Sequence, residues 1–372
     1  MRETPGYIPN PEAKPRSADG TAGGTLWESR TPPNNHSREP LFLREGGFFA
    51  FGELTRRKVV FMTATDHSQV IVSALLSDDE SRAAEEIISA AAVSDGRQAV
   101  SEQGRLRLKA REPRQGVVHL LQRAADQAVG YAQLELPAAG EAGQRGKAGT
   151  AELTVAPDHR GRGLGRQLID ALIAEADGPV EFWAHGGHPA ARHLADAYGA
   201  ELVRELRQMR RTADAPEQPP LPEGVTVRTF RPGEDDAEWL RLNALAFAHH
   251  PEQGSWTEQD LADRIAEPWF DPAGFFLATR GDRLVGFHWT KVHPEGLGEV
   301  YVVGVDPAEQ GSGLGRALTA VGLRHLAEDR KLQTVLLYVD ADNSAAVRVY
   351  ERLGFTIHEV DLMYRVQGPA QT

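Results

Sequence analysis

Three glycines stand at alternate positions in the string QGSGLGR, which covers residues 310–316. Glycine adopts positive φ angles and lets another group approach the backbone closely. A β-rich run precedes the string and a helix-like run follows it. The backbone N–H groups of the turn should therefore converge in front of the positive helix end. Gly311, Gly313 and Gly315 predict a turn that can hold a diphosphate, and Arg316 can add positive charge at its rim.

The string is neither of two familiar phosphate-binding motifs. It lacks the Lys-Ser/Thr pair of a P-loop and the glycine spacing of a dinucleotide-binding fingerprint. A single glycine-rich turn is weak support for binding, but this one occurs twice. Residues 153–168 read LTVAPDHRGRGLGRQL and residues 303–318 read VGVDPAEQGSGLGRAL. A later pair also matches, because AARHLADAYGAELV (190–203) parallels AAVRVYERLGFTIH (345–358). So long an interval indicates domain duplication and not a solenoid.

Each copy predicts the same order of elements: a β-rich run, the glycine turn, an amphipathic helix, a second β-rich run, a helix and a final strand. In the first copy the two β-rich runs cover 151–155 and 180–183, and the helix between them covers 165–176. In the second copy the runs cover 299–305 and 334–339, and the helix covers 315–328. We predict an α+β fold of two tandem domains, each a mixed, largely antiparallel sheet flanked by helices.

Prolines divide the copies. Residues 211–224 read RTADAPEQPPLPEG, which blocks both helix and central strand. We predict an N-terminal domain over 62–211, a linker over 212–224 and a C-terminal domain over 225–372. Residues 1–61 are predicted to be a disordered leader, because their first forty residues are rich in Pro, Gly, Ser and charge. Either the biological chain starts near Met62 or this leader is a real tail.

Composition excludes several classes. The formal net charge of -12 disfavours partners such as nucleic acid or a membrane surface, and no apolar run is long enough to cross a bilayer. The absence of cysteine excludes disulfides, thiolate zinc sites and a cysteine nucleophile, and is compatible with the cytoplasm. The histidines are not spaced like metal ligands, so we expect no metal. We also expect a monomer.

Both glycine turns, in their strand–turn–helix setting, resemble the acetyl-CoA-binding segment of the GNAT acetyltransferases. In that family the turn holds the diphosphate of CoA and the preceding strand pairs with its pantetheine arm. The resemblance implies acetyl-CoA contacts in the C-terminal domain from Val303, Gly304, Val305, Gln310, Gly311, Ser312, Gly313, Leu314, Gly315 and Arg316. In the N-terminal domain it implies contacts from Leu153, Thr154, Val155, Arg160, Gly161, Arg162, Gly163, Leu164, Gly165 and Arg166.

A further segment, residues 343–355, resembles the NxxAxxxYxxxGF end of that family. It implies additional acetyl-CoA contacts from Asn343, Ser344, Ala345, Ala346, Val347 and Arg348. Simpler explanations stand beside these, because Asn343 also suits a helix N-cap and Tyr350 a core position.

Amide formation from a thioester needs a neutral amine and a leaving thiolate. An α-amino group titrates near ~8, so a carboxylate acting through water can complete its deprotonation, while a hydroxyl can protonate the thiolate. Glu299 is the candidate base, and Tyr338, on the neighbouring strand, the candidate acid. For either residue alone an ordinary strand position is the better explanation. Together, on the two strands that splay around acetyl-CoA in the family, they favour catalysis. In the first copy Gly149 and Trp183 replace them, so we predict that this domain binds acetyl-CoA without transferring the acetyl group.

Longer strings resemble the mycothiol synthase family of actinobacteria: HPEQGSWT, WFDPAGF, GFHWTKVHPEGLGEVYVVGVDP and LLYVDADNSAAVRVYERLGF, with FWAHG and RELRQMRR in the first domain. That family acetylates the cysteinyl α-amine of cysteinyl-glucosaminyl-inositol, a small-molecule pseudo-disaccharide thiol, giving mycothiol and CoA. The resemblance implies substrate contacts from Glu102, Glu252, Lys291, Glu299 and Tyr338.

Glu102 belongs to the N-terminal domain, so a substrate that bridges both domains would explain why the degenerate copy is kept. Glu102 and Glu252 are explained almost as well as ordinary surface carboxylates. Two other functions stay open: a tandem N-acetyltransferase for another small amine, and a non-catalytic acetyl-CoA sensor.

Overall fold

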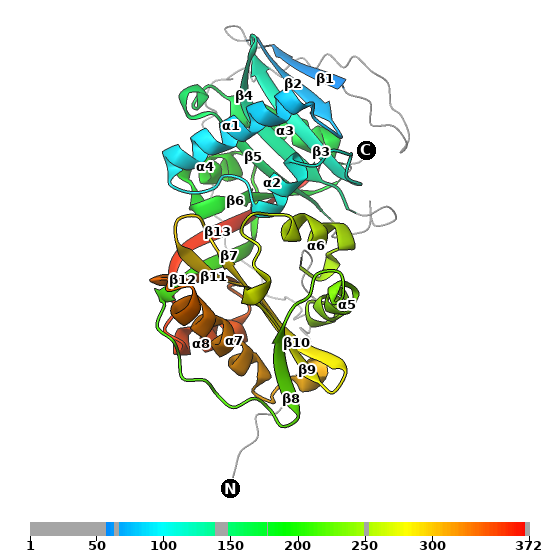
Figure 1. The fold of residues 1–372 in the computed structure, drawn as a ribbon. Helices are drawn as coiled ribbons and strands as arrows, with labels where there is room; N and C mark the ends of the chain where they lie inside the picture. Colours follow the sequence, from blue (N-terminus) through cyan, green and yellow to red (C-terminus); the bar gives the residue numbers. More distant parts are fainter. Residues whose placement is uncertain (1–56, 63–66, 138–147, 177, 249–252, 369–372) are drawn as a thin grey trace, which may run out of the picture. The chain divides into compact units, whose positions relative to one another are not determined.

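The computed structural model describes residues 57–62, 67–137, 148–176, 178–248 and 253–368, all within one compact unit, Pro40–Thr372 (Figure 1). Glu252 and residues 1–56 of the predicted leader lie outside the described residues. Residues 57–61, which we expected in the leader, instead form strand β1 (Arg57–Met62), which pairs antiparallel with β2 (His67–Ser73). The run Val59-Val60-Phe61 explains the difference, because β-branched and aromatic residues favour strands.

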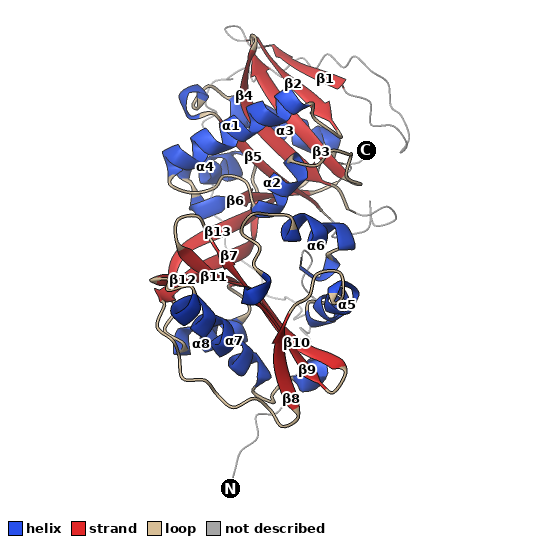
Figure 2. Ribbon diagram, in the orientation of Figure 1, coloured by secondary structure: helices blue, strands red, loops and turns tan. Residues whose placement is uncertain are grey.

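The described strands form one thirteen-stranded sheet (Figure 2). Those of the N-terminal domain continue with β3 (Val117–Ala124), β4 (Gln127–Glu135), β5 (Gly149–Val155), β6 (Val180–Ala184) and β7 (Glu201–Thr212). Those of the C-terminal domain are β8 (Val225–Thr229), β9 (Phe275–Arg280), β10 (Arg283–Val292), β11 (Leu297–Val305), β12 (Thr334–Asp340) and β13 (Thr356–Val366). Their order across the sheet is β1-β2-β3-β4-β5-β6-β13-β7-β12-β11-β10-β9-β8.

The final strands of the two copies exchange partners. By the internal repeat, β6 corresponds to β12 and β7 to β13. Yet β7 pairs with β12, and β13 pairs with β6. The two exchanged strands also pair with each other, so the red β13 lies between the green β6 and β7 in Figure 1. Two tandem α+β domains are confirmed, with the addition that they share one continuous sheet.

The described helices are α1 (Asp78–Asp95), α2 (Glu102–Leu108), α3 (Leu164–Glu175) and α4 (Pro189–Ala197) in the N-terminal domain, and α5 (Asp236–Ala246), α6 (Glu258–Ile265), α7 (Leu314–Arg324) and α8 (Ser344–Arg352) in the C-terminal domain. A π-helical turn (His325–Asp329) extends α7, so the helix predicted at 315–328 is confirmed almost in full. No helix among the described residues is long and apolar enough to cross a membrane.

Buried leucines one helical turn apart hold the two helices that follow the glycine turns. Leu164, Leu168 and Leu172 of α3 are at most 3% exposed, and Leu314 and Leu318 of α7 are fully buried. Residues at i and i+4 share one helix face, so each helix packs a leucine stripe on the sheet. This packing fixes the position of each helix N-terminus.

Candidate active site

Two parallel strand pairs diverge after a short contact, once in each domain. Residues 297–300 of β11 pair with residues 334–337 of β12, after which both strands continue unpaired to Val305 and Asp340 on their facing edges. In the first copy only residues 149–151 of β5 and 180–182 of β6 pair. The backbone of residues 303–305 is bonded to β10 on one side, which leaves its other edge available to an extended ligand.

Both glycine turns have the left-handed conformation that the sequence predicts. Gly311 and Gly313 have φ angles of +82° and +89°, and Gly161 and Gly163 have +74° and +83°. Gly313 is the N-cap of α7 and Gly163 that of α3. A Cβ atom at any of the four would meet no protein atom within 4 Å, so backbone conformation, and not internal packing, demands glycine.

Other residues of the C-terminal turn already have partners inside the protein. The hydroxyl of Ser312 donates to the carbonyl oxygen of Glu309 at 2.7 Å and accepts from the N–H of Leu314 at 3.3 Å. Gly304 lacks a side chain because a Cβ atom would lie 2.4 Å from the ring of Phe287. By contrast, Arg316 makes no ion pair with the described part of the chain, so its charge is available to a ligand.

Residues 343–348 surround the start of α8. The side chain of Asn343 accepts from the N–H of Ala346 at 3.1 Å, which makes it the N-cap of that helix. Tyr350 packs against Phe355 with ring centroids 5.9 Å apart, and its burial raises the pKa of its phenol. The two simpler explanations given by the sequence are thus correct, and neither prevents the helix start from contacting acetyl-CoA.

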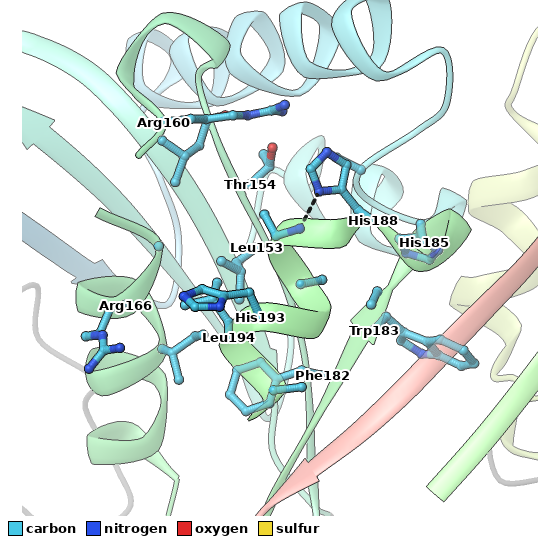
Figure 3. A pocket seen from close by; sticks show the side chains of 18 of the residues that line it. Leu153, Thr154, Arg160, Arg166, Phe182, Trp183, His185, His188, His193 and Leu194 are labelled. Atoms are coloured by element: carbon cyan, nitrogen blue, oxygen red, sulfur yellow. Dashed lines mark hydrogen bonds between the residues drawn. The ribbon is translucent and has the colours of Figure 1, made fainter. Parts of the chain in front are cut away.

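A pocket of about 430 Å³ lies in the N-terminal domain where the sequence predicts acetyl-CoA (Figure 3). Nine of the ten predicted residues line it: Leu153, Thr154, Val155, Arg160, Gly161, Gly163, Leu164, Gly165 and Arg166. Arg162 does not line it and donates to the carbonyl oxygen of Asp158 at 3.0 Å. The guanidinium of Arg160 is bound by both carboxylate oxygens of Asp95, at 2.6 and 2.9 Å, and is therefore committed within the protein.

Glu299 lies on β11 opposite Lys291 of β10 and is only 6% exposed. Its Oε2 atom is 2.7 Å from Nε2 of His293, which follows β10. A β-bulge between Trp289 and Thr290 gives β11 one extra residue, Tyr301, in this ladder. Glu299, Tyr301 and Lys291 lie on the same face of the two strands.

Tyr338 lies on β12 with 43% of its surface exposed. Its hydroxyl oxygen accepts from Nε2 of Gln208 at 2.8 Å. Burial of the hydroxyl raises the pKa of Tyr338, and the negative charge of Glu299 raises it further. Glu299 lies in the short paired stretch of β11, and Tyr338 follows the paired stretch of the neighbouring strand β12, where the two strands diverge.

Glu102 reaches from α2 into the C-terminal domain. Its Oε1 atom accepts from Nζ of Lys291, and its Oε2 atom from the hydroxyl of Tyr301 at 2.7 Å. Burial favours the neutral acid, but the Lys291 ammonium and the Tyr301 hydroxyl outweigh it and hold the pKa of Glu102 below its usual value. Two residues predicted to contact substrate, Glu102 and Lys291, are thus brought together across the domain boundary.

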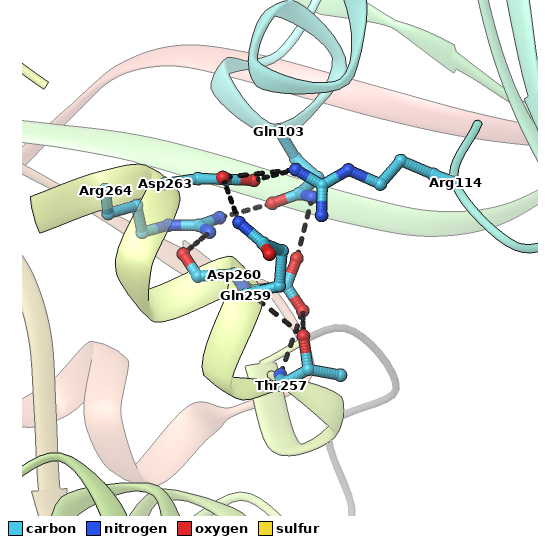
Figure 4. Close-up of polar contacts among 7 residues, drawn as sticks. All are labelled: Gln103, Arg114, Thr257, Gln259, Asp260, Asp263 and Arg264. Carbon is cyan, nitrogen blue, oxygen red and sulfur yellow. Dashed lines mark hydrogen bonds and ion pairs between the residues drawn. The ribbon is translucent and has the colours of Figure 1, made fainter. Parts of the chain in front are cut away.

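Sequence reasoning missed Arg264 of α6, which Figure 4 shows hydrogen-bonded to Gln103 of the N-terminal domain. Arg264 is only 3% exposed. Its guanidinium lies 3.6 Å from the ring centroid of Trp256, its Nε donates to Tyr301 at 2.8 Å, and its Nη2 donates to Oε1 of Gln103. Nearby, Arg114 of the N-terminal domain pairs with Asp263 at 2.8 Å. Arg264 therefore orients Tyr301 and anchors α2. No local sequence signal marks it, because its partners come from both domains.

Sequence reasoning considered His185 only as a loop or lining residue that is not spaced like a metal ligand. It lines the N-terminal pocket, with Nε2 2.8 Å from Glu152 and Nδ1 3.2 Å from Asp361 of β13. Burial would lower its pKa, but hydrogen bonds and charge from Asp361 and Glu152 raise the pKa of His185 to about 10. The imidazole is therefore charged at neutral pH.

The strand pairing places Trp183 of β6 at the position of Tyr338, as predicted, but Thr150 of β5, and not Gly149, at the position of Glu299. The extra residue Tyr301 in β11 shifts the register by one, so the predicted match to Gly149 is wrong.

Two diverging strand pairs, each leading through a glycine turn into a helix, define a protein with two tandem GNAT-type domains. Residues 239–355 match the "Acetyltransferase (GNAT) family" and residues 115–210 match an "Acetyltransferase (GNAT) domain". A solved tandem GNAT protein from the clavulanic acid biosynthesis pathway superposes with a TM-score of 0.62 at 18% identity, covering 82% of this chain and 100% of that one. At that identity the likeness shows the fold.

Several curated relatives are far more similar in sequence to this chain than that solved structure is. The mycothiol acetyltransferase of Streptomyces scabiei is 63% identical over 282 residues, which cover 75% of this chain and 89% of the relative. That of Streptomyces avermitilis is 60% identical over 298 residues, covering 79% and 94%. The chain belongs to the mycothiol acetyltransferase family and is an acetyltransferase enzyme. Proteins of the GNAT family use acetyl-CoA as the acetyl donor.

Proposed function

We propose that this enzyme transfers the acetyl group of acetyl-CoA to the cysteinyl α-amine of cysteinyl-glucosaminyl-inositol, giving mycothiol and CoA. Family membership supports the substrate. The observation that carries the chemistry is that a buried carboxylate, Glu299, and a hydrogen-bonded phenol, Tyr338, lie on neighbouring strands where β11 and β12 diverge.

The C-terminal glycine turn is the proposed diphosphate site. The free edge of Val303, Gly304 and Val305 would bond the pantetheine arm, and the backbone N–H groups around Gly311 and Gly313 would hold the diphosphate. Arg316 and the start of α8, residues 343–348, would complete the cradle. The thioester carbonyl then lies between the strands that carry the base and the acid.

Glu299 and Tyr338 together account for the protons that move during acetyl transfer. Glu299, acting through water, takes a proton from the attacking amine as the new C–N bond forms. The C–S bond breaks, and the sulfur leaves with the bonding electron pair and a proton from Tyr338. Solvent restores both groups to their starting states. His293, 2.7 Å from Glu299, fixes the orientation of the carboxylate.

The other end of the substrate would lie at Lys291 and Glu102. Carboxylate and ammonium groups suit the hydroxyls of a pseudo-disaccharide, and the pair spans the two domains. Glu252 stays a predicted contact outside the described residues. The N-terminal domain is proposed to bind acetyl-CoA in its pocket without catalysis, since Thr150 and Trp183, at the positions of Glu299 and Tyr338, supply neither a carboxylate nor a phenol.

We place the reaction in the cytoplasm, where acetyl-CoA is made, and expect a monomer that needs no metal. The described residues contain no group of three or more side chains able to hold a metal ion. The metal-free mechanism stays a prediction that a chelator tests directly, since turnover should be unchanged after dialysis against one.

A substrate panel tests the proposal. Purified protein and acetyl-CoA are mixed with cysteinyl-glucosaminyl-inositol, with a polyamine or with an N-terminal peptide, and CoA release is followed with a thiol reagent after correction for the substrate thiol. We expect rapid release only with the first. Acetylation of the polyamine or peptide alone would assign another amine, and release above background with none would favour an acetyl-CoA sensor.

A further inference from the structure

The exchange of final strands brings a residue of the N-terminal domain to the candidate acid of the C-terminal domain. Gln208 of β7 is the antiparallel partner of Tyr338 of β12, and it is 7% exposed. Its Nε2 atom lies 2.8 Å from the Tyr338 hydroxyl oxygen. Without the exchange, β7 would lie in the sheet of its own domain and Gln208 would not face this phenol.

The direction of that hydrogen bond is set by a third residue. Nε of Arg210, on the same strand, donates to Oε1 of Gln208 at 2.7 Å. Because a guanidinium can only donate, the amide oxygen must face Arg210 and the amide NH₂ group must face Tyr338. The phenol oxygen is therefore the acceptor, and the proton of Tyr338 is free to point at another group.

The same contact matters more as the phenol loses its proton. Three nearby carboxylates, Glu299, Asp361 and Glu359, disfavour a negative charge on Tyr338, whereas Gln208 favours it. Hydrogen bonds to a charged acceptor are stronger than those to a neutral one. An amide fixed in advance, aimed at the atom where charge develops, lowers the barrier with no reorganisation.

We propose that Gln208 is a positioning residue for Tyr338: it holds the phenol with its proton directed into the site, and it stabilises the phenolate left when that proton passes to the departing sulfur. The C–S bond breaks, the sulfur takes the electron pair and the proton, and solvent then reprotonates the phenolate. This inference rests on the proposed role of Tyr338 as the acid. It gives the N-terminal domain a part in the chemistry of its neighbour.

The test is a double-mutant cycle in the full chain. Gln208→Leu removes the donor at similar volume and should lower kcat about tenfold, as expected for one lost hydrogen bond to a developing charge. The KM for acetyl-CoA should change less than about twofold. In a Tyr338→Phe background the same substitution should have no further effect on kcat, because the group it serves is absent.

Two controls separate positioning from damage to the sheet. Arg207→Leu changes a neighbouring β7 residue whose side chain pairs with Glu205, and it should leave kcat unchanged. Gln208→Glu keeps the size but introduces an acceptor, so the phenol should turn its proton toward the new carboxylate. We expect a larger loss of kcat than for Gln208→Leu, and the ratio of the variant's kcat to that of the wild type at the same pH should rise at low pH as the new carboxylate is protonated.

Two results would overturn the inference while leaving the proposed function intact. One is an equal loss of kcat for Gln208→Leu with and without Tyr338, which would show a structural role. The other is an unchanged kcat for Gln208→Leu together with a strongly reduced kcat for Tyr338→Phe. Full activity of Tyr338→Phe would remove the acid role and this inference together, whereas failure of the substrate panel would contradict the proposed function itself.

Discussion

Tyr301 of the C-terminal domain donates its hydroxyl proton to Glu102 of the N-terminal domain at 2.7 Å. The same hydroxyl oxygen accepts from Arg264, so both its donor and its acceptor positions are used. Burial and the charge of Glu102 raise the pKa of Tyr301 well above its usual value, which keeps the phenol protonated at any physiological pH. A residue of the N-terminal domain is thus held beside the candidate active site by a fully oriented hydrogen-bond chain.

The base is tested by Glu299→Gln. The amide keeps the shape of the carboxylate but cannot accept a proton from the amine, so we expect kcat to fall about 100-fold or more. The KM for acetyl-CoA should be nearly unchanged, because Glu299 does not belong to the glycine turn. Steady-state CoA release measures both constants, and unchanged turnover would remove Glu299 from the mechanism.

The two glycine turns can be compared by one substitution made in each. Gly313→Ala places a Cβ atom on a residue at φ +89°, which costs about 1–2 kcal/mol and shifts the start of α7. We expect the KM for acetyl-CoA in turnover to rise about tenfold. The matched variant Gly163→Ala, at φ +83° in the N-terminal domain, should leave that KM unchanged. The reverse pattern would show that the productive acetyl-CoA site lies in the N-terminal domain and would contradict our proposal.

Glu102→Gln should affect both stability and substrate use. It leaves the Lys291 ammonium, whose side chain is 7% exposed, without its counter-charge. We expect the free energy of unfolding to fall by about 2 kcal/mol, less than for a fully enclosed pair because 20% of the Glu102 side chain is exposed. Chemical denaturation measures this change.

In turnover, Glu102→Gln should raise the KM for the pseudo-disaccharide and leave the KM for acetyl-CoA unchanged. Glu112→Gln, an exposed carboxylate of the same domain, serves as the control and should alter neither constant nor stability. Loss of stability with both constants unchanged would show that the Glu102–Lys291 pair is only structural.

His185 gives a prediction for pH. Its pKa is raised to about 10 in the folded chain, above the value near ~6.5 expected after unfolding. The stabilisation it contributes is therefore complete below about pH 6.5 and is lost as pH rises toward about 10. The difference in Tm between the wild type and His185→Gln should follow that course in thermal scans.

A variant of Asp361 tests whether the neighbouring carboxylates cause the raised pKa of His185. Asp361→Asn removes one of the two charges that face His185, so the pH-dependent difference should shrink and end at a lower pH. A Tm difference that stays constant between pH 6 and 10 would mean that the imidazole is not charged in the folded state.

Local pattern was enough to predict the elements that carry the site. Glycine spacing marked the turns, leucine periodicity marked α3 and α7, and prolines marked the linker. The contribution of Glu102 to the C-terminal domain followed from family resemblance. Each of these signals lies within a short stretch of chain or within a motif known from relatives.

What could not be predicted depends on partners far apart in sequence. Gln208 meets Tyr338 across 130 residues, and His185 meets Asp361 only because β13 lies beside β6. A strand's own residues specify its faces but not which neighbour it pairs with. Arg264 was invisible for the same reason, since an arginine in a short amphipathic helix normally faces solvent.

Since each copy lends its closing strand to the other, a cut in the proline-rich linker would not release two finished modules. Each fragment would expose an open sheet edge fitted to its missing counterpart, and mixing the fragments should reassemble the whole. The arrangement is what a strand-swapped pair of identical chains would become after fusion end to end. The N-terminal domain is therefore part of the scaffold on which the C-terminal site is built.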